Sequence, residues 1–186
     1  MFGRDSAGNA RWWFTSFEPS NKLPPDVRNR WREVTIPDRL KGWHKPGYDP
    51  KANGWERVEG SVFGVAPRGY AVSGDWMKDR LETSGEAVFV RKTVDIEDLN
   101  YKLFRLNTYS RQGFEVYING HKVASRTNRS RTWQASTVYL DEQQVAHLEP
   151  GKNVIAVRSF LQYFRGPTGG GVDVFLEGLR EFPGVE

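Results

Sequence analysis

The sequence predicts an all-β fold, an antiparallel β-sandwich, on the basis of two observations. Short runs of β-branched and aromatic residues follow one another between residues 87 and 180, separated by Gly, Pro and Asn, and no stretch has a long helical period. The composition, with 19 Gly, 10 Pro and 38% hydrophobic residues, is typical of a turn-rich β protein. A chain of 186 residues can bury a substantial core, so we expect a single domain over residues 1–186.

The first 60 residues are expected to be an irregular segment that packs on the sandwich, because they are rich in Trp and Pro and have few periodic runs. Within them, residues 12–15 predict a first strand, and residues 31–37 predict a short strand that Pro37 ends. Residues 43–55 predict a loop held in place by its aromatic side chains.

The clearest element is a β-hairpin that begins at residue 114. Apolar residues at positions 114, 116 and 118 alternate with Glu115 and Tyr117, which is the period of a half-buried strand. Asn119 and Gly120 then supply the two positive-φ positions that a two-residue turn requires. We therefore expect Val116 and Ile118 to lie in the core.

Further strands are expected on both sides of the hairpin. The apolar run from Val154 to Arg158 is nearly continuous and predicts a central strand, with Val154 and Ala156 in the core. In the last strand, residues 172, 174 and 176 should face one way and residues 173, 175 and 177 the other. Asp141 is a plausible N-cap for a helical turn before residue 148. The remaining strands are predicted at 87–94, 102–107 and 136–140.

Six segments carry a resemblance to a known family: Trp43 with Pro46-Gly47-Tyr48-Asp49 and Trp55, Phe63-Gly64, Arg91-Lys92, Glu115 to Gly120, Pro150 to Val157, and the Gly-rich entry to Val172. They resemble the galactose-binding-like jelly-roll domains, which are accessory or carbohydrate-binding domains of glycoside hydrolases and related polysaccharide-degrading enzymes. The resemblance covers residues 12–180. It implies a jelly-roll sandwich, cut from a larger extracellular or periplasmic protein, with a catalytic domain as its neighbour in the parent chain.

One departure from that family pattern concerns metal binding. Many relatives carry acidic residues before the hairpin, where this chain has Tyr109-Ser110-Arg111-Gln112-Gly113. Related sandwiches often hold a structural calcium, but the sequence shows no spaced acids like those of a calcium loop. We therefore expect no cofactor and leave a calcium site open.

Strand direction predicts that three connections share one end of the sandwich. Successive connections between antiparallel strands lie at alternate ends, so loops 108–113, 126–135 and 160–170 should all lie opposite the Asn119-Gly120 turn. These loops contain five arginines and no Asp or Glu, whereas the whole chain has a net charge of +4. The positive charge of the protein is thus expected to concentrate at this end.

Arginine and aromatic residues together suit an anionic sugar polymer. The guanidinium fork fits a carboxylate or sulfate in a bidentate manner, and aromatic faces stack on sugar rings. We therefore expect a non-catalytic module that binds a polysaccharide, of the sulfated or uronic-acid kind. The predicted ligand-binding residues are Tyr109, Arg111, Arg126, Arg129, Arg131, Trp133, Tyr163 and Arg165.

The sequence does not contain the residue patterns of thiol, metal or glycosidase catalysis. Cysteine is absent, which excludes thiol catalysis and cysteine-bound zinc, and no apolar run is long enough to cross a membrane. The three histidines have no metal-ligand spacing and are expected at the surface. Asp173 and Glu177 share one strand face, whereas a glycosidase needs two acids that face each other across the substrate. We therefore do not expect an enzyme.

Two alternatives stay open at this stage. In the first, the module has no ligand and docks its basic end on an acidic catalytic domain. Arginine and aromatic residues also suit single-stranded nucleic acid, but Lys and Arg are not enriched outside the three loops, so nucleic acid ranks last.

Overall fold

The computed structural model describes residues 11–17, 35–59, 63–64, 87–110, 113–127, 134–160 and 171–182. Two short helices lie within these ranges, the 3-10 turn η2 (Asp38–Leu40) and α1 (Glu142–Val145). The strands are β1 (Arg11–Phe17), β2 (Glu56–Glu59), β3 (Phe63–Gly64), β4 (Ala87–Ile96), β5 (Leu103–Ser110), β6 (Phe114–Ile118), β7 (His121–Arg126), β8 (Gln134–Tyr139), β9 (Gly151–Phe160) and β10 (Gly171–Leu179).

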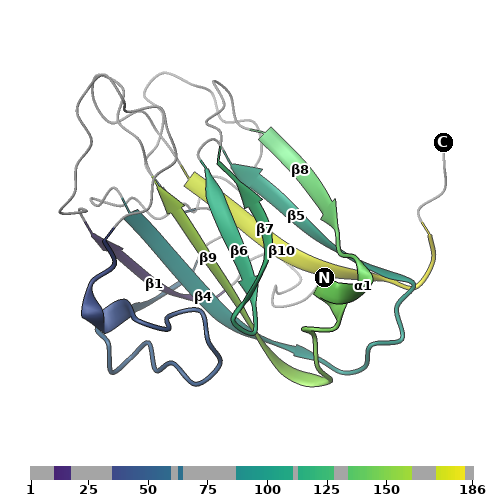
Figure 1. The fold of residues 1–186 in the computed structure, drawn as a ribbon, viewed down its shortest axis with the longest axis horizontal. Coiled ribbons are helices and arrows are strands. Elements are labelled where there is room, and N and C mark those ends of the chain that lie inside the picture. Colours follow the sequence, from purple (N-terminus) through teal and green to yellow (C-terminus); the bar gives the residue numbers. More distant parts are fainter. Residues whose placement is uncertain are drawn as a thin grey trace.

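The strands form two antiparallel sheets, which confirms the predicted sandwich (Figure 1). The six-stranded sheet has the order β2-β1-β4-β9-β6-β7, and the four-stranded sheet has the order β3-β10-β5-β8. One apolar cluster draws on both sheets, with Val116 and Ile118 from the first and Val174 and Leu176 from the second. Burial of this shared face is what holds the two layers together.

The predicted hairpin turn and its core positions are confirmed, but β6 is buried on both faces and not half-buried, since Glu115 is 4% exposed. Asn119 has φ 48° and Gly120 has φ 93°, the left-handed values that the two-residue turn needs. Val116, Ile118 and Ala156 are 0% exposed and Val154 is 6% exposed. β9 lies between β4 and β6, so it is a central strand as expected.

The predicted cap of the short helix is also present. The Asp141 carboxylate accepts a hydrogen bond of 2.8 Å from the backbone N–H of Gln144. In return the Gln144 side chain accepts one of 3.0 Å from the backbone N–H of Asp141, which completes a capping box. Gln144 Nε2 also donates to the carbonyl of Val123 at 2.8 Å, so the cap fixes the helix against β7.

Two of the segments that carry the sequence resemblance, residues 115–120 and 150–157, contact each other at the hairpin end. Asn119 Nδ2 donates to Asn153 Oδ1 and to the carbonyl of His147, both at 2.8 Å. Asn119 Oδ1 accepts from the backbone N–H of Val154 at 2.8 Å. Asn153, which is 0% exposed, bonds the N–H and the carbonyl of Glu149 with its own amide. These asparagines therefore have a structural role, joining the hairpin turn to the start of β9.

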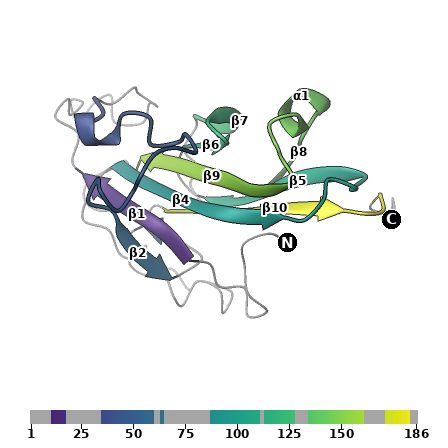
Figure 2. The same cartoon turned by 90° about the horizontal axis from the view of Figure 1, so that it is seen from below.

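Residues 35–55 cover the outer face of the six-stranded sheet (Figure 2, in blue). Trp43 and Trp55 are buried there and pack with Phe89 and Ala156 in a second apolar cluster. Arg91, buried on this face, donates from Nη1 to the carbonyl of Trp43 at 2.8 Å. The expectation of a loop held by its aromatic residues is confirmed.

The adjacent basic residue of β4 lies on the opposite face. Lys92 is 2% exposed, and its ammonium lies 4.3 Å from the ring centre of Trp12, which belongs to the main core. A cation over an indole face is a favourable arrangement when it is removed from water. The paired basic residues are thus both buried, one in each apolar layer.

Three expectations need correction. Residues 31–34 lie outside the described residues, but Thr35 to Pro37 form no strand, because the chain turns there into η2, with a bond from Leu40 N to Pro37 O of 2.8 Å. β5 extends to Ser110 because β8 and β10 pair with it on both sides. Tyr109 therefore lies in a strand and not in a loop.

The histidines are the third correction, since only His121 is exposed. His44 and His147 are half-buried, because the ring of His44 packs 4.7 Å from that of Tyr117 and the ring of His147 stacks 3.9 Å from that of His121. Burial and the charges of Lys45, Arg158 and Arg91 hold the pKa of His44 below its ordinary value.

Candidate functional site

Strand register brings the ends of the predicted loops together. Ser110 pairs with Val172 and with Gln134, and Phe114 pairs with Arg126 and with Ser159. The residues that lead into and out of the three connections therefore lie at one end of the sandwich, opposite the hairpin turn. Of the eight predicted site residues, Tyr109 and Arg126 are among the described residues, whereas Arg111, Arg129, Arg131, Trp133, Tyr163 and Arg165 lie outside them.

Arg126 connects the two sheets at this end. From β7 its Nη2 donates to the carbonyl of Ser110 at 3.0 Å and to the hydroxyl of Ser110 at 2.6 Å, and its Nη1 donates to Gln134 Oε1 at 3.1 Å. Its guanidinium carbon also lies 5.3 Å from the ring centre of Phe114. Burial lowers the pKa of Arg126 from its ordinary value. The side chain thus holds β5 and β8 against the end of β7.

Tyr109 belongs to the outer face of the four-stranded sheet, which faces away from the core. Strand alternation and register arrange this face in three rows across β10, β5 and β8. The rows are Asp173, Tyr109 and Ala135, then Phe175, Asn107 and Thr137, and finally Glu177, Arg105 and Tyr139. Asp173 and Glu177 share this face, as the sequence predicted.

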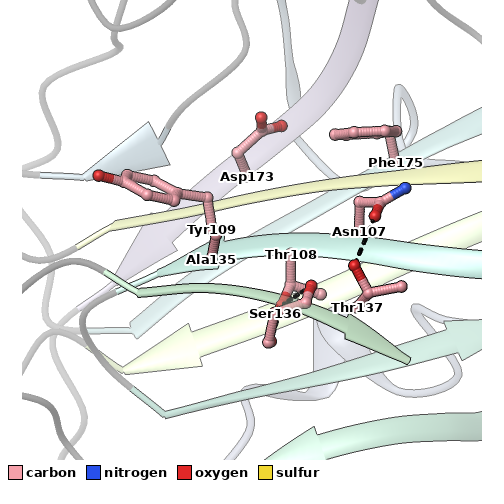
Figure 3. Close-up of a pocket in the computed structure, with 8 residues that line it drawn as sticks. All are labelled: Asn107, Thr108, Tyr109, Ala135, Ser136, Thr137, Asp173 and Phe175. Carbon is pink, nitrogen blue, oxygen red and sulfur yellow. Dashed lines mark hydrogen bonds between the residues drawn. The ribbon is translucent and has the colours of Figure 1, made fainter. Parts of the chain in front are cut away.

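The first two rows form a pocket of about 310 Å³ (Figure 3). Figure 3 shows Tyr109, Asp173 and Phe175 rising from the same side of the sheet. Ala135 is small, so the row that contains Tyr109 has no bulky side chain on β8. The lining residues are Asn107, Thr108, Tyr109, Ala135, Ser136, Thr137, Asp173 and Phe175.

Hydrogen bonds fix the polar side of the pocket. Thr137 Oγ1 donates to Asn107 Oδ1 at 2.9 Å, and Asn107 Nδ2 donates to Glu177 Oε2 at 3.2 Å. Arg105 Nε donates to the same carboxylate oxygen at 2.7 Å. This bond, together with the charge of Glu177, holds the pKa of Arg105 above its ordinary value. The amide of Asn107 is therefore held in one orientation, with Glu177 paired to a cation.

The chemistry of the pocket suits a ligand rich in hydroxyl groups. Tyr109 and Phe175 supply aromatic surface, and Asp173, Asn107 and Thr137 supply hydrogen-bonding groups beside it. Small-molecule sites combine apolar surface with a few placed polar groups in this manner. The residues other than Tyr109 were not predicted as site residues, although the alternation of residues 172–177 had placed Asp173 and Phe175 on one face.

Catalytic and metal chemistry find little support in the described residues. Asp173 and Glu177 stand on one face of one strand, and Glu177 is engaged by Arg105 and Asn107. Within the described ranges, no group of three or more His, Asp or Glu side chains gathers to hold a metal ion. No helix in the same ranges is long and apolar enough to cross a membrane.

No family model matches this chain, and no curated protein matches it. Among solved structures it is similar to a β-glycosidase from Bacteroides vulgatus, with 18% identity over 88% of this chain and 19% of that chain and a TM-score of 0.42. It is also similar to a β-glucuronidase from Bifidobacterium dentium, with 13% identity over 82% of this chain and 19% of that one and a TM-score of 0.42. A third is a family 35 carbohydrate-binding module from an environmental isolate, with 14% identity over 63% of this chain and 85% of that one and a TM-score of 0.40.

The two enzymes are far longer than the matched region, since this chain spans 19% of each. At these identities and TM-scores, the function of this chain rests on its own side chains.

Proposed function

We propose that this chain is a non-catalytic carbohydrate-binding domain of a polysaccharide-active enzyme. The observation that supports it is the pocket on the outer face of the four-stranded sheet, where aromatic and hydrogen-bonding side chains stand next to each other. The parent protein would act outside the cytoplasm, where polysaccharides are found, and its catalytic domain would be a neighbour of this one.

A sugar ring matches both halves of this pocket. Its C–H faces are apolar and can lie against Tyr109 or Phe175, while its hydroxyls donate to Asp173 and exchange hydrogen bonds with Asn107 and Thr137. Because the Asn107 amide is already held by Thr137 and Glu177, little side-chain freedom is lost when a ligand binds there.

We further propose that the bound polymer is anionic and that its charges meet the arginines of the three connections. Arg111 follows the end of β5, Arg131 and Trp133 precede β8, and β5 and β8 are the strands that carry the pocket. A polysaccharide held at Tyr109 would thus continue toward these connections. Arg129, Tyr163 and Arg165 belong to the same group, and Arg126 contributes through the position that it gives to Ser110 and Gln134.

Affinity electrophoresis in gels that contain one polysaccharide at a time tests both the carbohydrate binding and the preference for an anionic polymer. We expect retardation by sulfated or uronic-acid polysaccharides, weakening with added salt because exposed charge pairs are screened beyond about 8 Å at physiological ionic strength. The Tyr109→Ala variant should lose affinity by about tenfold, the size of one good aromatic contact.

The control is Phe182→Ala, which removes an aromatic side chain that is 69% exposed and outside the pocket, and it should bind normally. Equal retardation by neutral glucans would contradict the anionic ligand and leave carbohydrate binding in place. No retardation by any polysaccharide would contradict the proposed function and favour a structural domain that docks on its catalytic neighbour.

A further inference from the structure

Beyond the pocket, one aromatic side chain stands exposed on the same outer face. Tyr139 is 54% exposed and ends β8, in the third row with Arg105 and Glu177. Among the described residues it is one of two large hydrophobic side chains that remain exposed, the other being Phe182. Its exposure leaves ring surface available for contact with a partner.

Strand register places Tyr139 beside the polar wall of the pocket. Tyr139 pairs with Arg105 of β5, and Arg105 Nε donates to Glu177 at 2.7 Å. Glu177 in turn holds Asn107, which lines the pocket. The row that contains Tyr139 is therefore continuous with the polar wall of the pocket, so one ligand lying along β8 could contact both.

The spacing between Tyr139 and the pocket sets the size of the ligand that could touch both. Ala135, opposite Tyr109, and Tyr139 lie four residues apart on β8, which corresponds to about 13 Å along the strand. Thr137 stands between them on the same face and also lines the pocket. A single sugar ring is too short to span this distance, whereas an oligosaccharide is long enough.

We propose that Tyr139 forms a second sugar subsite, so that the outer face of the four-stranded sheet binds a chain of several sugar residues along β8. One residue of the chain occupies the pocket at Tyr109 and a later one stacks on Tyr139. Thr137 and Asn107 face the hydroxyls of the residues between them. This inference rests on the proposed function, since it assigns a ligand length to the same binding face.

The test compares ligand lengths. Oligosaccharides of one to six residues are cut from the polysaccharide that retards the protein most, and each is titrated calorimetrically into the protein and its variants. In the unsubstituted protein, affinity should increase with length until the chain reaches Tyr139. The Tyr139→Ala variant should lose about tenfold in affinity for the six-residue ligand, and change less than twofold for the single sugar.

Tyr139→Phe keeps the ring and removes the hydroxyl, so it should retain most of the affinity for the longer ligand. Phe182→Ala, the other exposed aromatic, should be unchanged at every length. If Tyr139→Ala binds the six-residue ligand as well as the unsubstituted protein does, or loses the same factor for both lengths, the second subsite is refuted while carbohydrate binding stands. If the unsubstituted protein binds no length, the proposed function fails and the subsite fails with it.

Discussion

Replacement of Arg126 by Ala tests whether this arginine of the predicted site also stabilises the fold. The substitution removes three hydrogen bonds that join β7 to β5 and β8, and the contact of the guanidinium with the Phe114 ring. An arginine that only lined a solvated edge would make no such bonds. The two roles therefore predict different free energies of unfolding.

The magnitude follows from the burial of the groups that lose a partner. Ser110 is 0% exposed, so its hydroxyl and carbonyl are not readily supplied with water when the guanidinium is removed. A buried polar group left without a partner costs about 1–3 kcal/mol, whereas the bond to exposed Gln134 contributes little. We expect Arg126→Ala to lower the free energy of unfolding by about 2–4 kcal/mol, which lowers Tm by about 5–15 °C for a chain of this size.

Urea and thermal unfolding followed by circular dichroism measure this change. The Tm of Arg126→Lys should lie between that of the unsubstituted protein and that of Arg126→Ala, because one ammonium cannot bridge Ser110 and Gln134 as the planar guanidinium does. Arg180→Ala is a suitable control, since Arg180 is exposed and its ion pair with Asp98 is 3.7 Å long. A Tm of Arg126→Ala within about 2 °C of the unsubstituted protein would refute the structural role, because surface substitutions have effects of that size.

Two further predictions concern the polar groups that support the sandwich. Asn153→Ala should lower the free energy of unfolding by about 2–4 kcal/mol, because it leaves the side chain of Asn119 and the backbone of Glu149 without their shared partner. The control is Asn100→Ala, since Asn100 is exposed, and equal stabilities for the two variants would contradict this prediction. Burial acts to raise the pKa of Glu115, but bonds from Arg158 and Tyr117 and the charge of Lys122 outweigh it, so the pKa lies below its ordinary value of 4.5. The stability that this ionised carboxylate contributes is present above pH 4.5 and is lost as the pH falls through the lowered pKa. Glu115→Gln should therefore flatten the acid side of a plot of Tm against pH. An unchanged acid side would contradict this prediction.

Local sequence signals predicted the elements that depend on neighbouring residues. Asn119-Gly120 could be identified because few other pairs adopt two positive φ angles in succession. Asp141 could be identified as an N-cap because its short carboxylate can accept a bond from a backbone N–H of the first helical turn. The alternation around Val116 predicted its burial for a similar reason. In each case the physical cause acts within a few residues.

The pocket could not be predicted in the same way, because its residues come from three strands that are distant in the sequence. Whether Tyr109 stands beside Asp173 or beside Phe175 depends on the register of β5 with β10, and a shift of one residue would turn either side chain toward the core. The strand predicted for residues 102–107 also ended too early to include Tyr109. Only the pairing of β5 on both sides reveals that this residue belongs to the sheet.

The Asn119-Gly120 turn has a consequence for the chemical lifetime of the protein. An asparagine followed by glycine is the pair most prone to lose its side-chain amide, because the small glycine lets its backbone nitrogen reach the side-chain carbon. Here the Asn119 amide is held by hydrogen bonds to His147, Asn153 and Val154, which restrict its rotation toward the glycine nitrogen. Conversion to aspartate would replace Asn119 Nδ2, which donates to the carbonyl of His147 and to Asn153 Oδ1, by a carboxylate oxygen that cannot donate. Loss of this amide would therefore remove the bonds that join the hairpin turn to the start of β9.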